Sequence, residues 1–547
     1  MRVRCHNCRM PDAPWWRATS IYQVYPRSYF DTNADGIGDL PGIIDRLDYI
    51  RDLGPEMVWV SPFFASPQRD FGYDVTDYEA VAEEYGTLAD AQRLIDEAHA
   101  RGLRVMFDLV LNHTSDEHPW FRRSRSSRSN PKSDWYIWAD GRADDGRKPP
   151  NNWKSAMEFT SAWQYCPQRQ QWYMCSFLPF QPDLNWRNPE VKQAMFDTVR
   201  FWLDKGVDGF RLDLFGVIMK DPALRDNPVQ PRLYNGFPRW TRRDHTENTP
   251  DNIALAKKLR AICDEYPGDR ALLGEVFGPA DVLQAYLGEG DGLNLVFLFD
   301  FLTFRYDAGW FAKTIADFER TFPAPMQPTY VLENHDRSRL IDRVGGDVAK
   351  AKVLAVVLLT LRGVPTVYMG QEIGMSNTPL PFKKALDPVA SSVFRWVPQF
   401  VVDRMPERLN RDEVRTPMQW DDSPNAGFCA PDVQPWLPVN PDYPRVNVAT
   451  QTGQPDSLLE LYRQLFALRR DEPTMREAPV VLLTSLPEGV LGYRRDDVIV
   501  LANMGTGAAT VPYTGKTLVR TGTVEVESTR TTLLKDSAVV LRVPSGR

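Results

Sequence analysis

Cysteine is scarce in this chain, with six residues among 547. A fold held together by disulfides needs a much higher cysteine density in a shorter chain, so the composition excludes a disulfide framework. Cys5 and Cys8 form a single CxxC pair, and the other four cysteines are scattered. Because no second CxxC supplies the remaining ligands, the pattern does not favour a structural zinc site.

The chain also lacks an excess of positive charge and any long apolar run. Its 65 Lys and Arg stand against 72 Asp and Glu, a net charge of −7, which argues against a nucleic-acid partner. The longest apolar run, residues 353–361, is far shorter than the roughly 20 residues that cross a bilayer. No apolar segment of a signal peptide follows the first residues. We therefore expect a soluble, cytoplasmic monomer or small homo-oligomer without a membrane partner.

Aromatic residues and proline are abundant, with 16 Trp, 20 Tyr, 27 Phe and 44 Pro. Large rings fill apolar cores, and their flat faces also suit sugar rings. From composition alone, a Trp-rich core is the simpler interpretation. The hydrophobic share of 43% and the charged share of 25% are ordinary and predict a globular protein with a sizeable core.

Short apolar runs alternate with amphipathic helical stretches over most of the chain. The runs are rich in Val, Ile, Leu and Phe without strict alternation, as expected of parallel strands covered on both faces. The eight predicted strands are residues 21–26, 57–62, 103–110, 209–213, 271–276, 293–300, 329–335 and 365–372. Helical patterns lie between several of them, at residues 88–101, 189–205, 252–266 and 348–362. Eight strands alternating with helices predict an α/β fold, a (β/α)8 TIM barrel rather than a doubly wound sheet.

Two stretches interrupt this alternation. Residues 112–186 are rich in Trp, Pro, Arg and Ser and too long for a simple loop, so we predict an inserted small domain after the third strand. Residues 375–450 are rich in Pro, Asn and Asp and predict a long excursion after the eighth strand. The barrel then comprises residues 14–111 and 187–477, and the Val- and Thr-rich residues 478–547 predict a C-terminal β-sandwich.

Carboxylates gather at the ends of the predicted strands. Asp213 ends the fourth strand, Glu275 lies at the end of the fifth, and Asp336 follows the seventh. The carboxyl ends of barrel strands face one rim, so these side chains are expected to converge. Such a set favours glycoside cleavage. In that reaction one carboxylate attacks the anomeric carbon or activates water, and a second, protonated carboxyl group donates its proton to the leaving oxygen. Arg211 lies on the same strand face as Asp213 and would hold that carboxylate ionised.

The motifs that contain these residues resemble those of a known family. They are DLVLNH at residues 108–113, QPDLN at 181–185, GFRLD at 209–213, GEV at 274–276, NHD at 334–336 and GVPTVYMGQE at 363–372. With them the chain resembles the α-amylase superfamily, glycoside hydrolase family 13. Within that family it is similar to the α-glucosidase and oligo-1,6-glucosidase group over nearly its whole length.

Carried over by position, the resemblance implies roles for the residues of the rim. Asp213 becomes the nucleophile, Glu275 the general acid/base and Asp336 the carboxylate that stabilises the transition state. The residues implied to orient the nucleophile or bind the sugar are Asp70, Tyr73, His113, Arg211, His335 and Arg411. Tyr73 would be the platform on which the sugar stacks, and Asp108 is expected to be a buried structural partner. No organic cofactor is implied.

An Asp- and Asn-rich segment follows the first predicted strand. It places oxygen ligands at positions 1, 3, 5 and 9 of an EF-hand-like loop, with glycine at position 6. Position 12 is Gly42 rather than Glu, which excludes a complete EF-hand, and a turn without metal would have the same composition. The resemblance implies one structural Ca²⁺, with Mg²⁺ as the alternative, held by Asp31, Asn33, Asp35, Ile37 and Asp39.

The activity implied is that of a retaining, exo-acting α-glucosidase. It would release glucose from the non-reducing end of maltose and short α-gluco-oligosaccharides through a covalent glucosyl-enzyme intermediate. A transglucosylase, or a sugar isomerase acting on trehalose or sucrose, would use the same intermediate and stays an alternative. A non-catalytic barrel homologue is disfavoured because such relatives lose an acid, whereas this chain keeps all three. Leu214 follows neither the Val of α-1,6-preferring relatives nor the Ala or Thr of α-1,4-preferring ones, which leaves the linkage open.

Overall fold

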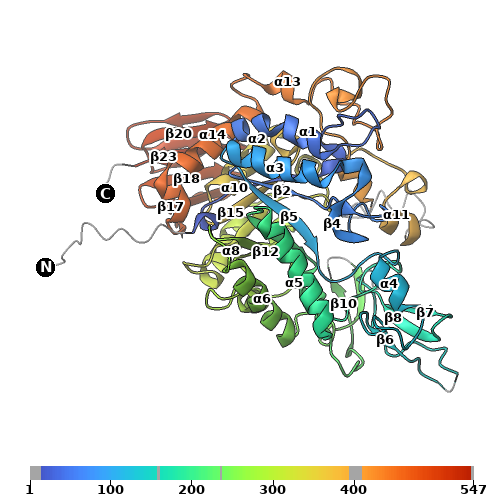
Figure 1. Cartoon of the computed structure of the whole chain (residues 1–547). Coiled ribbons are helices and arrows are strands. Elements are labelled where there is room, and N and C mark those ends of the chain that lie inside the picture. The colour runs from blue at the N-terminus through green and yellow to red at the C-terminus, as the bar shows by residue number, and fades with distance from the viewer. Residues whose placement is uncertain (1–13, 144, 157–159, 235–236, 394–409, 544–547) are drawn as a thin grey trace.

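The computed structural model describes residues 14–143, 145–156, 160–234, 237–393 and 410–543, so the CxxC pair lies outside the described residues. Its centre is a closed barrel of eight parallel strands in the order β1-β15-β14-β13-β12-β9-β5-β2 (Figure 1). These are β1 (Ile21–Val24), β2 (Met57–Val60), β5 (Arg104–Val110), β9 (Gly209–Asp213), β12 (Ala271–Gly274), β13 (Leu295–Leu298), β14 (Thr329–Val331) and β15 (Val364–Tyr368). Each predicted strand overlaps one of them, which confirms the TIM barrel.

Helices pack around the outside of the barrel. They are α1 (Leu40–Asp45), α2 (Leu47–Leu53), α3 (Leu88–Ala100), α5 (Pro189–Asp204), α6 (Pro250–Cys263), α7 (Ala280–Leu287), α8 (Ala308–Thr321), α9 (Leu340–Arg343) and α10 (Val348–Thr360). The four predicted helical stretches correspond to α3, α5, α6 and α10. As predicted, α5 begins at Pro189. Proline suits this first position, because the backbone N–H that it lacks would have no partner within the helix. The side chain of Asn188 caps the helix by accepting the N–H of Glu190.

The strand period of two decides which side chains face the barrel interior. The lower layers of the interior are apolar and contain Ile21, Met57, Trp59, Met106, Leu273, Phe297 and Val364. Two residues further along three of these strands, the inward positions become polar: Gln23 after Ile21, Asp108 after Met106 and Glu275 after Leu273. The same alternation turns Arg211 and Asp213 of β9 inward. Polar groups therefore collect above a packed apolar interior.

The chain between β5 and α5 forms a separate unit on one side of the barrel (Figure 1). It contains α4 (Pro119–Ser124) and a three-stranded sheet in the order β6-β8-β7, with β6 (Trp138–Ala139), β7 (Trp163–Cys166) and β8 (Gln171–Met174). Trp153, Trp163 and Met174 form its small core. This unit is the predicted insertion after the third barrel strand. The structure also contains two small two-stranded sheets. One pairs β3 (Phe64–Ala65) with β4 (Asp77–Val81), and the other pairs β10 (Val229–Tyr234) with β11 (Phe237–Thr241).

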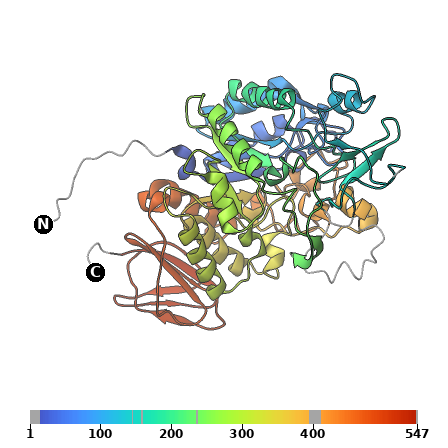
Figure 2. The same ribbon diagram turned by 90° about the horizontal axis from the view of Figure 1, so that it is seen from below.

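The chain after the barrel ends in two antiparallel sheets. The excursion carries α11 (Pro388–Val393) and α13 (Val448–Gln451) and leads into α14 (Leu458–Asp471) and α15 (Pro473–Glu477). The sheets have the orders β16-β17-β18-β23-β20 and β19-β22-β21 and share one apolar core. Their strands are β16 (Val481–Leu482), β17 (Val490–Arg495), β18 (Val498–Asn503), β19 (Ala509–Val511), β20 (Lys516–Thr521), β21 (Val524–Val526), β22 (Thr531–Leu533) and β23 (Ser537–Arg542). This predicted sandwich lies on the opposite side of the barrel from the insertion (Figure 2).

The longest apolar run of the sequence lies in α10. Ala351 and residues 353–360 are buried, because α10 packs against α14 and against β18 and β23 of the C-terminal sheet. A helix that is apolar all round belongs in a protein interior or in a membrane. Among the residues that the structure describes, no helix is both long and apolar enough to cross a bilayer.

Two buried arginines join the end of α10 to its neighbours. Arg469 of α14 donates to the carbonyl oxygen of Leu359 at 3.2 Å, and Arg495 of β17 donates to that of Thr360 at 3.0 Å. The last carbonyls of a helix have no partner within the helix, so these guanidiniums satisfy them. The C-terminal sheets are thus attached to the barrel by hydrogen bonds as well as by apolar packing.

Replacing Arg495 with Met is expected to lower the free energy of unfolding by about 2–3 kcal/mol, because buried carbonyl groups lose a charged donor. Denaturant-induced unfolding measures this change. Arg494→Met is the matched control. The side chain of Arg494 lies on the other face of β17 and is less buried, so we expect the free energy of unfolding to change by no more than about 0.5 kcal/mol. Equal losses in both variants would contradict the anchoring role.

Candidate active site

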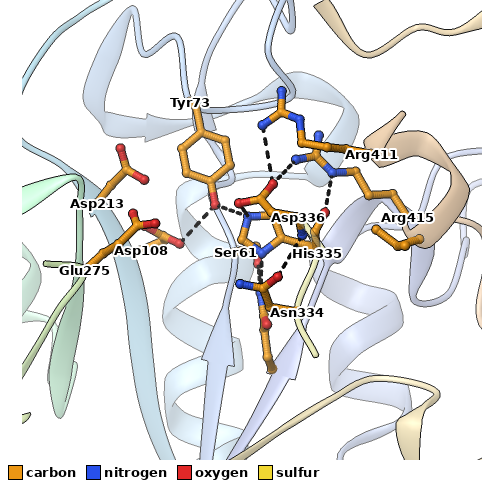
Figure 3. A network of polar contacts seen from close by, with 12 residues as sticks. Ser61, Tyr73, Asp108, Asp213, Glu275, Asn334, His335, Asp336, Arg411 and Arg415 are labelled. Atoms are coloured by element: carbon orange, nitrogen blue, oxygen red, sulfur yellow. Dashed lines mark hydrogen bonds and ion pairs between the residues drawn. The ribbon is translucent and has the colours of Figure 1, made fainter. Parts of the chain in front are cut away.

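The loops and strand ends at one end of the barrel bring together residues that are far apart in the sequence (Figure 3). Asp213 is the last residue of β9, Glu275 follows β12, and Asp108 lies near the end of β5. Asp336 lies after β14, and Arg411 begins the 3-10 helix η8 (Arg411–Val414) of the excursion. The three acids that the sequence singled out therefore lie on one rim.

Arg211 is the centre of one half of the site. Its Nη1 lies 2.9 Å from Asp108 Oδ1 and 2.7 Å from Asp213 Oδ1. Its Nη2 lies 2.6 Å from Glu275 Oε2. β9 lies between β5 and β12 in the barrel, so a side chain on β9 reaches carboxylates on both neighbouring strands. One buried guanidinium thus orients three buried carboxylates.

Leu214, directly after Asp213, has a left-handed backbone conformation with φ 42° and ψ 39°. This conformation costs a residue other than glycine about 1–2 kcal/mol. It directs the Leu214 N–H to Glu275 Oε2 at 3.0 Å, the same oxygen that Arg211 contacts. The strained backbone therefore supplies a second donor that fixes one oxygen of Glu275.

Three carboxylates share the single positive charge of Arg211. Burial raises the pKa of Asp108 to about 6, against the opposing charge of Arg211. Burial also raises the pKa of Asp213; Arg211 opposes this shift, whereas the charges of Glu275 and Asp108 add to it. Because neighbouring like charges resist full ionisation, the cluster retains a proton more readily than isolated carboxyls do. It can therefore hold one acid protonated beside an ionised one.

Asp336 is the centre of the other half of the site. Its Oδ1 lies 2.6 Å from Arg415 Nη2 and 3.4 Å from Arg411 Nη1. Its side chain is 31% exposed, whereas that of Asp213 is 6% exposed, so Asp336 presents the more open carboxylate surface. Desolvation raises its pKa, but the positive charges of Arg411, Arg415 and Arg211 outweigh that effect and hold the pKa of Asp336 well below its usual range. Asp336 is therefore ionised.

Arg411 links Asp336 to Asp70. Its Nη2 lies 2.9 Å from Asp70 Oδ1 and 2.7 Å from Asp387 Oδ1. The amide of Gln181, from the insertion, donates to Asp70 Oδ2 at 2.9 Å. The structure thus brings the predicted pair Asp70 and Arg411 together, and it ties the insertion to the excursion beside the acids.

Tyr73 lies between the two halves of the site. Its hydroxyl oxygen is 2.6 Å from His335 Nε2 and 3.4 Å from Asp108 Oδ2. Its ring is almost parallel to that of His335, with 5° between the planes. Tyr73 and His335 are both buried. Figure 3 shows the two side chains in contact, beside Asp336.

His113 is bonded within the protein. Its Nε2 lies 3.1 Å from the carbonyl oxygen of Tyr73, and its Nδ1 lies 3.1 Å from Asn112 Nδ2. Burial lowers the pKa of His113 to about 4 and keeps the ring neutral. The implied bond to a sugar hydroxyl would therefore compete with the bond to the Tyr73 carbonyl.

Sequence reasoning did not single out three residues of this network. Arg415 lies in the same motif as Arg411, four residues later. The spacing of the two arginines could have indicated that both reach the same site. Gln23 lies two residues after the inward-facing Ile21, and strand parity could have placed it in the barrel interior. Asp387 carries no local signal, because its contact with Arg411 depends on how the excursion folds back.

The Asp-rich loop is held by its own side chains. Asp31, Asn33 and Asp35 each accept the backbone N–H of the residue two positions further on. Asp39 accepts the N–H of Gly42 at 2.6 Å and so caps α1. Over the described part of the chain, no group of three or more His, Cys, Asp or Glu is placed to hold a metal ion. A cation here would need the Asn33 amide oxygen and the Ile37 carbonyl oxygen as ligands, which are donors that Ca²⁺ accepts.

The barrel, its insertion and the acids on its rim define a TIM-barrel enzyme suited to glycoside chemistry. A family model described as the alpha amylase catalytic domain matches residues 23–478. The chain therefore belongs to the α-amylase family, glycoside hydrolase family 13, as its motifs predicted.

Several relatives match most of the chain. A probable alpha-glucosidase of Rhizobium meliloti is 41% identical over 519 residues, 91% of each chain. An oligo-1,6-glucosidase of Parageobacillus thermoglucosidasius is 38% identical over 487 residues, 83% of this chain and 84% of the relative. The chain is thus an enzyme of the α-glucosidase group.

Solved structures of the same fold include enzymes with other names. An alpha-glucosyl transfer enzyme has a TM-score of 0.87 at 38% identity and covers 97% of this chain and 100% of its own. An isomaltulose synthase variant of Erwinia rhapontici, in complex with its natural substrate sucrose, has a TM-score of 0.88 at 32% identity. The match covers 98% of this chain and 100% of the synthase. The fold is thus shared by glucosidases, transferases and isomer synthases.

Proposed function

We propose that the protein is a retaining, exo-acting α-glucosidase that releases glucose from the non-reducing end of maltose and short α-gluco-oligosaccharides. The observation that carries this proposal is the pairing of Asp213 and Glu275 with the two terminal nitrogens of Arg211. Asp336, held by its own arginine pair, supplies the third carboxylate. The contact between Arg411 and Asp70 supports exo action, because it joins two loops beside the acids.

The reaction proceeds in two steps. Asp213 attacks the anomeric carbon while Glu275 gives its proton to the departing glycosidic oxygen, which forms a glucosyl ester and frees the shortened sugar. Glu275 then takes a proton from water, which attacks the anomeric carbon and restores the Asp213 carboxylate. Each step inverts the anomeric centre, so the α-configuration is retained. The ionised Asp336 stabilises the positive charge that develops on the sugar ring.

Product analysis by chromatography tests this proposal. We expect glucose as the first product from maltose, isomaltose or p-nitrophenyl α-glucoside, without internal cleavage of longer chains. The proposal is wrong if maltose, isomaltose, sucrose and p-nitrophenyl α-glucoside all remain intact. The relative rates on these substrates also establish the linkage preference, which Leu214 leaves open.

Glucosyl transfer is the second candidate function. The alpha-glucosyl transfer enzyme is 38% identical to this chain, the same identity as the oligo-1,6-glucosidase of Parageobacillus thermoglucosidasius, and this supports it. In that reaction a sugar hydroxyl replaces water in the second step. Raising the maltose concentration would then yield trisaccharides at the expense of free glucose, whereas a strict hydrolase yields glucose alone at every concentration.

Replacing Asp108 with Asn is expected to shift the acid limb of the kcat/KM profile to lower pH by about one unit. The variant keeps the side-chain shape but removes a negative charge that raises the pKa of Asp213. A carboxylate nucleophile works only when ionised, so a lower pKa preserves activity to lower pH. A pH–rate profile measures the shift. An acid limb that stays in place or moves to higher pH would contradict the conclusion that the charge of Asp108 raises the pKa of Asp213.

We propose a structural Ca²⁺ in the loop that contains Asp31, Asn33 and Asp35, with Mg²⁺ as the alternative. Side-chain and carbonyl oxygens are the ligands these cations prefer, and the loop lies apart from the acids in sequence. Chelation should remove one bound metal per chain and lower the melting temperature, because a ligand of the folded state stabilises it. Unchanged metal content and melting temperature after exhaustive chelation would refute the site.

A further inference from the structure

Each ring nitrogen of His335 has one close partner. Nδ1 lies 2.7 Å from the amide nitrogen of Gln23, and Nε2 lies 2.6 Å from the hydroxyl oxygen of Tyr73. Nε2 also lies 3.5 Å from Asp336 Oδ2. Gln23 comes from β1, is fully buried, and donates its other amide hydrogen to Ser61 Oγ at 3.1 Å. Gln23 thus reaches the site from within the barrel.

The direction of these bonds follows from the carboxylates. Asp108 Oδ2 accepts the indole N–H of Trp59, and it lies 3.4 Å from the Tyr73 hydroxyl, which therefore points its hydrogen at Asp108. The Tyr73 oxygen is then free to accept, which favours a hydrogen on Nε2 of His335. The carboxylate of Asp336 favours a hydrogen on the same nitrogen. A neutral ring with Nε2–H leaves Nδ1 bare, and a bare nitrogen requires the donor that the Gln23 amide supplies.

The same contact opposes a second proton on the ring. An imidazolium would place an N–H at Nδ1 against the N–H of Gln23, so that two donors would face each other. The charged and titratable groups that face His335 are Asp336, Tyr73, Tyr25, Arg211, Arg411 and Arg415. Asp336 favours protonation, whereas burial and the three arginines oppose it and lower the pKa of His335 to about 3.

We propose that Gln23 is a positioning residue that locks His335 in the neutral Nε2–H tautomer and so keeps one hydrogen-bond donor aimed between Tyr73 and Asp336. The inference deepens the proposed glucosidase function, because a donor at this place can bind a hydroxyl of the glucosyl unit. It also assigns the charge balance of Asp336 to Arg411 and Arg415 rather than to an imidazolium.

Two substitutions test the lock from opposite directions. Gln23→Glu replaces the donor with an acceptor and should draw a proton onto Nδ1, whereas Gln23→Met removes the donor and keeps similar volume. Nitrogen-15 spectra of enzyme labelled at its six histidines report which ring nitrogen carries hydrogen, and His335→Gln assigns the signal. Gln327→Met is the matched control, because Gln327 is buried at the opposite end of β14.

The wild-type spectrum should show His335 with a hydrogen on Nε2 alone between pH 5 and pH 8. Gln23→Glu should show hydrogen on Nδ1. Both Gln23 variants should lose about 10- to 100-fold in kcat/KM, by analogy with the loss of residues that orient metal-binding histidines. A wild-type ring protonated on Nδ1 overturns the proposal, and so do Gln23 variants with an unchanged spectrum. The spectra do not depend on activity, so this test stays valid even if the glucosidase assay fails. If Gln23→Glu does not fold, Gln23→Met is the variant to be measured.

Discussion

Replacing Asp213 with Asn is expected to lower kcat on α-glucosides by at least about 10⁴-fold. The amide has the shape of the carboxylate and can keep a contact with Arg211, but it cannot form the glucosyl ester. Burial of the residue leaves little room for water to act in its place. Steady-state kinetics on p-nitrophenyl α-glucoside measures the loss.

Chemical rescue identifies what Asp213 contributes. In Asp213→Gly, azide can enter the vacated space, attack the anomeric carbon in a single step and give the β-glucosyl azide. Asp208→Asn is the control, since Asp208 lies at the other end of β9 and binds His99 and Arg270. We expect that control to lose stability while it keeps kcat. Near-normal kcat in Asp213→Asn would remove Asp213 from the mechanism.

Replacing Glu275 with Gln is expected to lower kcat on maltose by about 10³- to 10⁴-fold, because the departing sugar then leaves without a proton. On p-nitrophenyl α-glucoside the leaving group needs no proton, so the first step should persist and the glucosyl ester should accumulate. Rapid-quench kinetics would then show a burst of p-nitrophenol followed by slow turnover.

Azide distinguishes the two acids. It needs no general base, so in Glu275→Gln it should speed the second step and give the α-glucosyl azide, the opposite anomer from the Asp213→Gly product. Equal loss on both substrates, with no burst and no α-azide, would contradict the role of Glu275 as acid and base.

The barrel could be predicted because its determinants are local. Each strand is a short apolar run, each major helix has its own period, and Pro189 after Asn188 marks the beginning of α5 in both sequence and structure. The inward placement of Asp108, Arg211 and Asp213 also follows from a strand period of two. A resemblance of motifs then implied their roles.

The contacts that depend on tertiary folding could not be predicted in this way. Asp387 and Asp70 meet Arg411 only because the excursion folds back over the rim. The bonds of His113 to Asn112 and to the Tyr73 carbonyl depend on side-chain orientation, which a sequence pattern does not specify. Aromatic abundance likewise did not show which rings would form the barrel interior and which the wall of the site.

The covalent glucosyl ester on Asp213 is the central claim, and mass spectrometry of the trapped enzyme tests it most directly. A fluorinated α-glucosyl fluoride slows the second step more than the first, so the ester should accumulate. Peptide mapping should find one fluoroglucosyl group on the peptide that contains Asp213, and Asp213→Asn should carry none. An adduct on another residue, or turnover to the β-anomer without any adduct, would contradict the account.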